Sequence, residues 1–255
     1  VGSDGFIQQA TTNVPRFDHD PATGESLGLL IDEARTNLLT YSEEFDQWTA
    51  ASNSIIAPNS IAAPDGSLTA DKIYFNTINS TNIGQNVTLT QNQTYTFSVY
   101  AKAVTPGSNN QFVPYINSPL FHTPSTSFVA TSEWQRFTFT FTHSDSTAST
   151  GVFILNQNDA YKTNVYFWGA QLEEGSFPTS YIPTTSTTVT RAADSAIIDG
   201  TSVLTGTYTM IEKPASCAVE SGGNIELQAG YTAERVMVFP AALSAQQITD
   251  IRSAM

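Results

Sequence analysis

Hydrophobic and polar side chains alternate along the central part of the chain. Residues 94–103 follow this pattern, and so do residues 134–142, in which Phe137, Phe139 and Phe141 share one face. Successive side chains of a β-strand point to opposite faces of the sheet. Each segment therefore predicts a strand with one face in a core and one wetter face.

Four further segments predict strands. Residues 70–75 and 83–89 alternate more weakly, whereas residues 151–155 and 165–172 are apolar on both faces. An apolar pattern on both faces is typical of strands in the middle of a packed sandwich. Loops rich in Asn, Ser, Pro and Gly separate these segments, so the pattern predicts an all-β protein with a jelly-roll β-sandwich.

The two ends of the chain contain shorter segments whose residues predict turns, strands and a helix. Pro21 and Gly24 separate two apolar runs near the N-terminus, which predicts a hairpin. The Pro- and Thr-rich residues 177–190 predict a linker or a strand that crosses between units. Short strands are predicted after it, at residues 196–198, 208–211, 224–228 and 235–239. Ser244, with Gln247 three residues later, predicts the start of one short C-terminal helix.

Composition and charge exclude several classes of function. Only 13% of the 255 residues are charged, and 10 basic against 23 acidic residues give a net charge of −13. Such an acidic surface repels nucleic acid and anionic membranes, and no apolar run is long enough for membrane insertion. The single cysteine, Cys217, excludes an internal disulfide framework.

The sequence gives no positive evidence for an enzyme. No Gly-x-Ser-x-Gly motif is present, and the chain has only three histidines. Acidic residues gather at Glu43, Glu44 and Asp46 and again at Glu173 and Glu174. Neighbouring acids on a strand point in different directions, so neither cluster alone forms a catalytic pair, although a pair such as Glu44 with Glu173 remains open.

Three aromatic residues are the candidate ligand-binding groups. Tyr74, Tyr100 and Trp134 fall on the faces opposite the core positions of their strands. Aromatic rings on a sheet face can stack on the apolar face of a sugar, while Asn, Gln and Thr bind its hydroxyls. The alternative is that these rings are half-buried under loops or against another subunit. Other aromatic residues are predicted to lie in loops: Trp48, Tyr115, Phe121 and Tyr161.

Two blocks of sequence resemble a known group of proteins. Residues 15–25 with 28–39, and residues 165–175 with 180–184 and 190–194, are similar to blocks common in bacteriophage tail and fibre proteins. They bracket a jelly roll that resembles a carbohydrate-binding module, and the resemblance covers roughly residues 1–194. Residues 234–244 are similar to the closing strand and helix of laminin-G-like or concanavalin-like lectin domains.

This resemblance divides the chain into three parts. It implies an N-terminal hairpin segment at residues 1–36, a jelly roll at 37–185, and a C-terminal β segment with the helix at 186–255. The two terminal segments are expected to form one smaller β unit, with the jelly roll inserted between them. Because the chain begins at Val1 and relatives often have residues upstream, we expect it to be a fragment of a longer protein.

The resemblance also implies a function and partners. It implies a non-enzymatic structural protein on the virion, in a tail, baseplate or head fibre, that forms a homotrimer with other virion proteins as neighbours. Its β-sandwich is expected to bind polysaccharide on the host surface. The alternatives are a scaffolding or decoration module that binds no sugar, and a tailspike depolymerase with facing carboxylates.

A structural calcium ion is the one cofactor that the resemblance implies. In jelly-roll sugar-binding modules, an acid near the first strand and another near the last commonly hold this ion. The corresponding residues here are Glu44, Asp46 and Gln171, and a glutamine stands where an acid is expected. From the residues alone, the spacing of Glu43, Glu44 and Asp46 favours a solvated acidic turn over a cation site.

Overall fold

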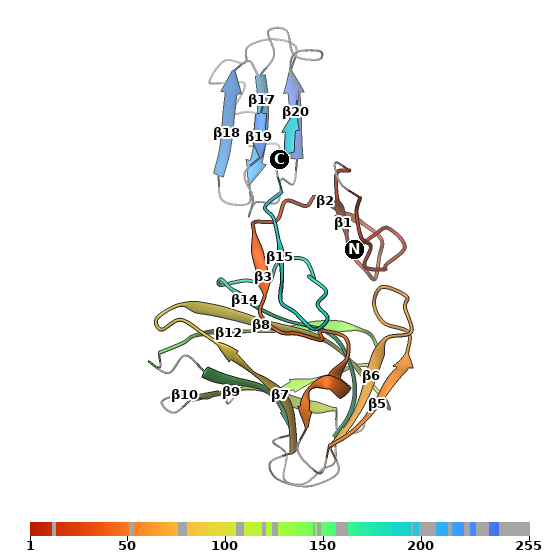
Figure 1. Ribbon diagram of the computed structural model, residues 1–255. Coiled ribbons are helices and arrows are strands. Elements are labelled where there is room, and N and C mark those ends of the chain that lie inside the picture. The colour runs from red at the N-terminus through yellow and green to blue at the C-terminus, as the bar shows by residue number, and fades with distance from the viewer. Residues whose placement is uncertain are drawn as a thin grey trace. The chain divides into compact units, whose positions relative to one another are not determined.

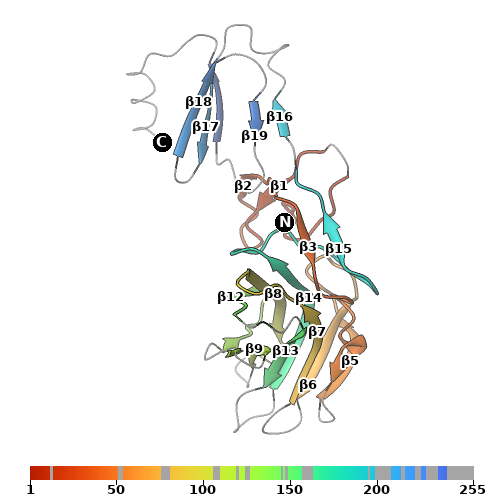
Figure 2. The same ribbon diagram turned by 60° about the vertical axis from the view of Figure 1, so that its left-hand side comes forward.

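The computed structural model shows a nearly all-β protein that divides into two compact units (Figures 1 and 2). One unit is residues 35–191, and the other joins residues 1–34 with 192–255. The structure describes residues 1–11, 14–50, 54–75, 81–105, 110–118, 121–123, 127–144, 146, 149–156, 163–194, 196–198, 208–213, 216–221, 225–227 and 235–239. Within these residues, no helix is long and apolar enough to cross a bilayer.

Residues 35–191 form a β-sandwich of two antiparallel sheets, which confirms the predicted jelly-roll fold (Figure 1). The five-stranded sheet has the order β12-β8-β14-β6-β5, with the bounds Gln135–Thr142, Thr94–Ala103, Thr163–Glu174, Ala70–Phe75 and Ser54–Ile61. The six-stranded sheet has the order β10-β9-β13-β7-β4, with the bounds Phe121–Thr123, Gln111–Ser118, Ser149–Asn156, Thr81–Thr88 and Thr49–Ala50. Its sixth strand, β11 (Phe128–Val129), pairs with β9.

The core lies between the two sheets, where the predicted apolar faces meet. Phe112 of β9 packs edge-on against Phe137 of β12 and Phe167 of β14, with ring centroids 5.2 and 5.0 Å apart. Phe141 is buried, and Phe137 and Phe139 are partly buried against the same cluster. The alternation of Phe with Thr in β12 therefore separates a core face from a wetter one, as predicted.

The sandwich unit begins and ends on neighbouring strands. β3 (Arg35–Asn37) pairs with β15 (Val189–Arg191), so the Pro- and Thr-rich stretch ends in a strand rather than a free linker. A single 3₁₀ turn, η1 (Phe45–Gln47), follows β3 and buries Phe45 and Trp48 in the core. Trp48 lies in a bend directly after η1, which agrees with its predicted position in a loop, and its buried ring packs 4.8 Å from that of Phe45.

The terminal segments form the other unit, as predicted. β1 (Phe17–His19) and β2 (Ser26–Leu29) make the expected N-terminal hairpin. β16 (Ala196–Ile198) pairs with β19 (Ile225–Leu227), and β17 (Tyr208–Lys213) lies between β18 (Ser216–Ser221) and β20 (Arg235–Phe239). The predicted helix after Ser244 lies outside the described residues.

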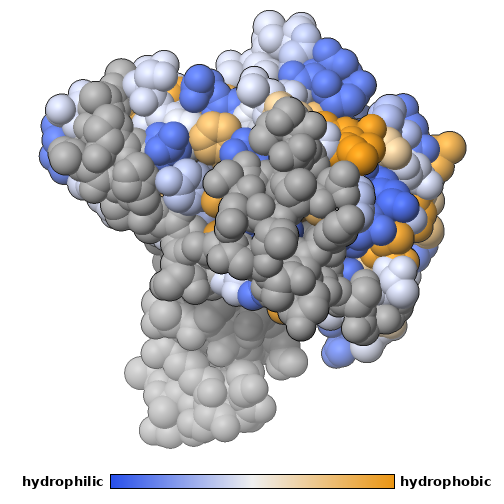
Figure 3. All heavy atoms as spheres, turned by 90° about the horizontal axis from the view of Figure 1, so that it is seen from below, coloured by the Kyte–Doolittle hydropathy of each residue, from blue (hydrophilic) through white to orange (hydrophobic). Residues whose placement is uncertain are grey.

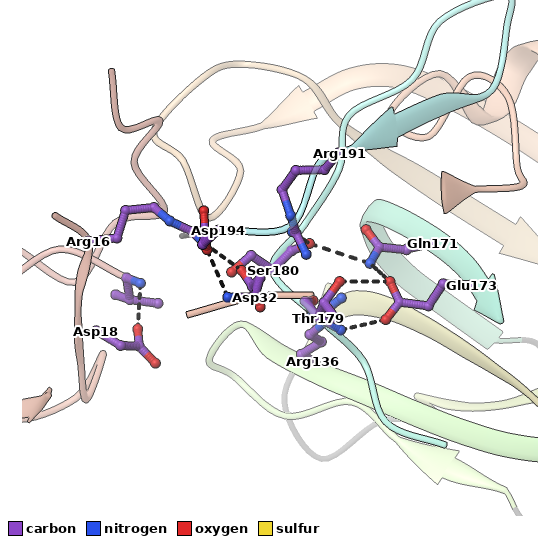
Figure 4. Close-up of polar contacts among 11 residues, drawn as sticks. Arg16, Asp18, Asp32, Arg136, Gln171, Glu173, Thr179, Ser180, Arg191 and Asp194 are labelled. Carbon is purple, nitrogen blue, oxygen red and sulfur yellow. Dashed lines mark hydrogen bonds and ion pairs between the residues drawn. The ribbon is translucent and has the colours of Figure 1, made fainter. Parts of the chain in front are cut away.

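An ion-pair cluster ties the two terminal segments together (Figure 4). The Arg16 guanidinium donates to Asp32 at 2.9 Å and also to Asp194. The backbone N–H of Asp32 donates to the Asp194 carboxylate at 2.7 Å, and the N–H of Asp194 donates to the Asp32 carbonyl at 2.8 Å. A charge-assisted network therefore joins the N-terminal segment to the first residues of the C-terminal segment.

Candidate functional site

The three predicted aromatic residues lie along the outer side of the five-stranded sheet. Tyr74 lies on β6, Tyr100 on β8, and Trp134 directly before β12, and all three are half-buried. The Tyr100 ring packs edge-on against Trp168 at 5.5 Å and lies under the Arg136 guanidinium at 5.5 Å. The Trp134 indole N–H donates to the Ala62 carbonyl at 3.1 Å. Tyr100 and Trp134 thus already make contacts within the unit.

The end of this sheet face near Glu173 is covered by the chain that follows β14 (Figure 4). Glu173 accepts hydrogen bonds from the Thr179 N–H at 2.5 Å and from the Thr179 hydroxyl at 3.0 Å. The Ile182 N–H donates to the Gln171 side-chain oxygen at 2.7 Å. These buried contacts exclude a ligand from this part of the face.

Tyr181 extends the cover over Trp168, whose ring lies 4.5 Å from it. The Tyr181 hydroxyl hydrogen-bonds to the Ser42 hydroxyl at 2.6 Å and donates to the Glu43 carboxylate at 3.0 Å. Burial, together with the nearby Glu43 charge, raises the pKa of the Tyr181 hydroxyl well above its ordinary value. The hydroxyl therefore stays protonated and available as a donor at neutral pH.

A second aromatic surface lies on the outer face of the six-stranded sheet. Phe153 of β13 stands opposite Gly84 of β7 on one side and Tyr115 of β9 on the other. A Cβ atom added at Gly84 would lie 2.1 Å from the Phe153 ring, and one added at Gly151 would lie 2.2 Å from it. The ring therefore lies directly over both glycines, in space that any other residue at either position would occupy with its side chain.

The neighbours of Phe153 complete a mixed aromatic and polar surface. The Tyr115 ring lies 6.4 Å from that of Phe153, and both rings are half-buried. Asn86 and Asn117 flank Gly151 on the adjacent strands, and both are exposed. We call Tyr115, Phe153, Asn86 and Asn117 the Phe153 face. It places a flat ring beside carboxamide donors and acceptors, which is the combination that a sugar ring requires.

The sequence analysis did not predict this surface. Tyr115 and Phe121 were predicted to lie in loops, which is wrong, because they lie in β9 and β10. Tyr161 lies outside the described residues. The apolar stretch of β13 was correctly assigned to a central strand, but the role of Gly151 as the support of an aromatic ring required the neighbouring strands.

The predicted calcium ligands do not form one donor set. Glu44 and Asp46 are exposed beside η1, whereas Gln171 is fully buried and makes its hydrogen bonds with Glu173, Ser180 and Ile182. Within the described part of the chain, no group of three or more His, Cys, Asp or Glu residues is placed to hold a metal ion. Calcium binding by these residues stays a prediction that their contacts do not support.

Glu44 and Glu173, which the sequence analysis left open as a catalytic pair, do not have the geometry of one. The Glu173 carboxylate is buried and accepts hydrogen bonds from Thr179 and Gln171, whereas Glu44 is exposed. Glycoside hydrolysis needs two carboxyl groups on either side of a substrate, so a buried partner held by the protein's own donors is unsuitable.

One buried carboxyl group has a clearly shifted pKa. Asp71 of β6 is 1% exposed and accepts hydrogen bonds from the N–H groups of Phe45 at 2.8 Å and Asn59 at 2.9 Å. Burial raises its pKa to about 6, although these two hydrogen bonds act in the opposite direction. The group joins η1 and β5 to the sheet from inside the protein, so its role is structural.

Figure 3 shows one face of the molecule, seen from below. In this view from below, the hydrophobic residues drawn in colour form small patches separated by hydrophilic ones.

Part of the sandwich unit matches a known protein family. Residues 41–162 match a family described as "Carbohydrate binding domain", and this range contains every residue of the Phe153 face. No curated protein matches the chain.

Among solved structures, the chain is similar to a CBM4 domain, with 21% identity and a TM-score of 0.37 over 56% of this chain and 96% of that one. It is also similar to the CBM22-1–CBM22-2 tandem domain of Paenibacillus barcinonensis Xyn10C, with 11% identity and a TM-score of 0.44 over 80% of this chain and 85% of that one. A third similar structure is the enzymatically active domain of tailspike protein 4 of bacteriophage CBA120, with 9% identity and a TM-score of 0.38. That match covers 54% of this chain but only 21% of the tailspike chain.

Proposed function

We propose that residues 35–191 form a non-enzymatic glycan-binding module that holds a polysaccharide on the Phe153 face. The observation that carries the proposal is the Phe153 ring lying over Gly84 and Gly151, 6.4 Å from the Tyr115 ring. The match of residues 41–162 to a carbohydrate-binding domain supports it.

The chemistry of this face favours an uncharged stretch of glycan. The apolar side of a sugar ring stacks on Phe153 and Tyr115, while the exposed amides of Asn86 and Asn117 exchange hydrogen bonds with its hydroxyls. None of these four side chains carries a charge, so affinity comes from stacking and from neutral hydrogen bonds.

Binding to a glycan array of neutral polysaccharides, followed by titration of the best ligand, tests this proposal. We expect Phe153→Ala to lower affinity at least about tenfold, because an aromatic group at the centre of a contact carries much of its energy. Phe153→Leu keeps an apolar side chain of similar size but no flat ring, and we expect it to lose nearly as much. Circular dichroism verifies the fold of both variants.

Trp134→Ala is the matched control on the other sheet. It removes an aromatic ring from the outer side of the five-stranded sheet and should leave neutral-glycan affinity unchanged. If Trp134→Ala abolishes binding while Phe153→Ala does not, the neutral site lies on the five-stranded sheet and the proposal is wrong.

We further propose that this module is displayed on a bacteriophage virion, in a tail, baseplate or head fibre, as a homotrimer that attaches to the host surface. The resemblance of residues 15–25 and 28–39, and of residues 165–175, 180–184 and 190–194, to phage tail and fibre proteins supports this context. A density map of the intact particle tests it. An exposed Phe153 face agrees with attachment, whereas burial of that face against a neighbouring virion protein identifies a scaffolding role.

A further inference from the structure

Two lysines lie on either side of one tyrosine on the outer face of the five-stranded sheet. Tyr166 of β14 stands directly opposite Lys72 of β6 on one side and opposite Lys102 of β8 on the other. Directly opposed residues have Cβ atoms about 5 Å apart, so the three side chains leave the sheet as one row. All three are half-buried.

This row lies outside the part of the face that residues 179–182 cover. The cover contacts Gln171 and Glu173, which follow the bulge of β14, whereas Tyr166 precedes that bulge. Tyr74 lies beside the row, opposite Asn164. We call Lys72, Lys102, Tyr166 and Tyr74 the lysine–tyrosine row.

The two lysines differ from the arginines of the sandwich in the contacts that they make within it. The chain has four lysines, and two of them flank Tyr166. The arginines of the sandwich are engaged within it: Arg136 donates to the Thr179 carbonyl at 2.7 Å, and Arg191 donates to the Ser180 carbonyl at 2.9 Å. Among the described residues, neither Lys72 nor Lys102 forms an ion pair.

We propose that the lysine–tyrosine row is a second glycan-binding site, specific for carboxylate-bearing sugars of the uronic acid class. Each ammonium group pairs with a sugar carboxylate, and the tyrosine rings contact the apolar faces of the sugar rings. Charge complementarity selects this occupant, because a neutral glycan offers the two ammonium groups hydroxyl acceptors but no opposite charge. The net charge of −13 opposes every polyanion, and it opposes nucleic acid most because phosphates are the most closely spaced charges, so uronate binding depends on the local pair of ammonium groups.

The site is independent of the Phe153 face, so the two proposals fail separately. The test uses the whole chain with polygalacturonate and hyaluronan as probes, and with the carboxyl-reduced forms of the same polymers as neutral counterparts. We expect the wild type to bind at least one of the uronate polymers and to lose at least about tenfold in affinity when its carboxyl groups are reduced.

Three variants locate the binding. Lys72→Gln and Lys102→Gln should each weaken uronate binding at least about fivefold, and Tyr166→Ala should weaken it as well. Lys213→Gln, in the other unit, changes the net charge by the same amount as each lysine variant and should have no effect. Circular dichroism verifies that all four variants are folded, and neutral-glycan binding at the Phe153 face should stay unchanged in each of them.

The proposal is wrong if the wild type binds neither uronate polymer, or if it binds one with equal affinity in Lys72→Gln, Lys102→Gln and Lys213→Gln. Sedimentation velocity measures the oligomeric state and gives a second result that could contradict the proposal. If Lys72→Gln or Tyr166→Ala changes the oligomeric state and leaves uronate binding intact, the row is a contact between copies of the chain.

Discussion

At the scale of single residues, Asn37 joins both ends of the sandwich unit. Its side-chain oxygen accepts the N–H groups of Leu39 and Leu172, both at 3.1 Å. Its amide group donates to the carbonyls of Ala170 at 3.1 Å and Ile182 at 2.9 Å. A fully buried side chain thus satisfies backbone groups from three segments, as an asparagine but not an aspartate can.

We therefore expect Asn37→Asp to destabilise the sandwich by about 2–4 kcal/mol, because it removes both donors and buries a charge against two carbonyl groups. Urea unfolding followed by tryptophan fluorescence measures the effect. Asn86→Asp, at an exposed position of β7, is the matched control and should change the free energy of unfolding by less than about 0.5 kcal/mol. Equal stability of the two variants would contradict this role of Asn37.

Asp71 makes stability depend on pH. Because its pKa is about 6 in the folded protein and 3.8 in an ordinary environment, the folded state holds the proton more tightly than the unfolded state. Its contribution to stability is therefore complete below about pH 4 and is lost as the pH rises through about 6. We expect this loss to amount to about 1–3 kcal/mol.

Comparison with Asp71→Asn isolates this contribution, since the variant has no proton to lose at this position. The free energy of unfolding of the wild type, minus that of the variant, should fall between pH 4 and pH 7. Urea titrations at half-unit pH steps measure it. A difference that stays constant, or one that rises with pH, shows that the hydrogen bonds from Phe45 and Asn59 outweigh burial.

At the scale of elements, the Phe153 face depends on glycine in two adjacent strands. A methyl group at Gly151 would lie 2.2 Å from the Phe153 ring, so Gly151→Ala must displace the ring. We expect this variant to lose about 1–3 kcal/mol of stability and to bind neutral glycan as weakly as Phe153→Ala. In a Phe153→Ala background the three atoms nearest to the added methyl group are absent, so the same change should cost less than about 0.5 kcal/mol.

The four proteins of this double-mutant cycle are compared by urea unfolding. A coupling energy near zero would mean that the ring does not occupy the space above Gly151, and the proposed stacking surface would lose its support.

The strands of the sandwich that alternate, or that are apolar on both faces, were predictable from the sequence, whereas two strands that contain a proline were not. β8 and β12 follow the two-residue period along their whole length, and their core faces are the predicted ones. β5 and β9 were missed, since Pro58 and Pro114 interrupt them and proline is unfavourable within a sheet. β5 is an edge strand with an irregular register, and the pairing of β9 with β13 is visible only in three dimensions.

In the candidate sites, too, the sequence predicted what depends on one strand but not what depends on the pairing of strands. The aromatic positions Tyr74 and Tyr100 were correctly predicted to lie off the core, because that follows from periodicity within one strand. The juxtaposition of Phe153 with Gly84, or of Tyr166 with two lysines, depends on which strands are neighbours and in which register. Long-range pairing of this kind leaves no local signal in the sequence.

At the scale of the whole molecule, both proposed sites belong to one of the two units. Residues 35–191 contain the core, the Phe153 face, the lysine–tyrosine row and all four partners of Asn37. The pairing of β3 with β15 closes this unit at its two ends, so it contains the contacts that an independent domain requires.

We therefore expect a protein of residues 35–191 alone to fold and to bind neutral glycans with the affinity of the whole chain. Its urea unfolding should be a single cooperative transition, because one core connects its two sheets. The matched comparison is Arg16→Gln in the whole chain, which removes the ion pairs to Asp32 and Asp194 within the other unit and should leave glycan affinity unchanged. If residues 35–191 unfold without cooperativity, or bind neutral glycan several-fold more weakly than the whole chain, the terminal segments contribute to the site and the assignment of function to the sandwich alone is wrong.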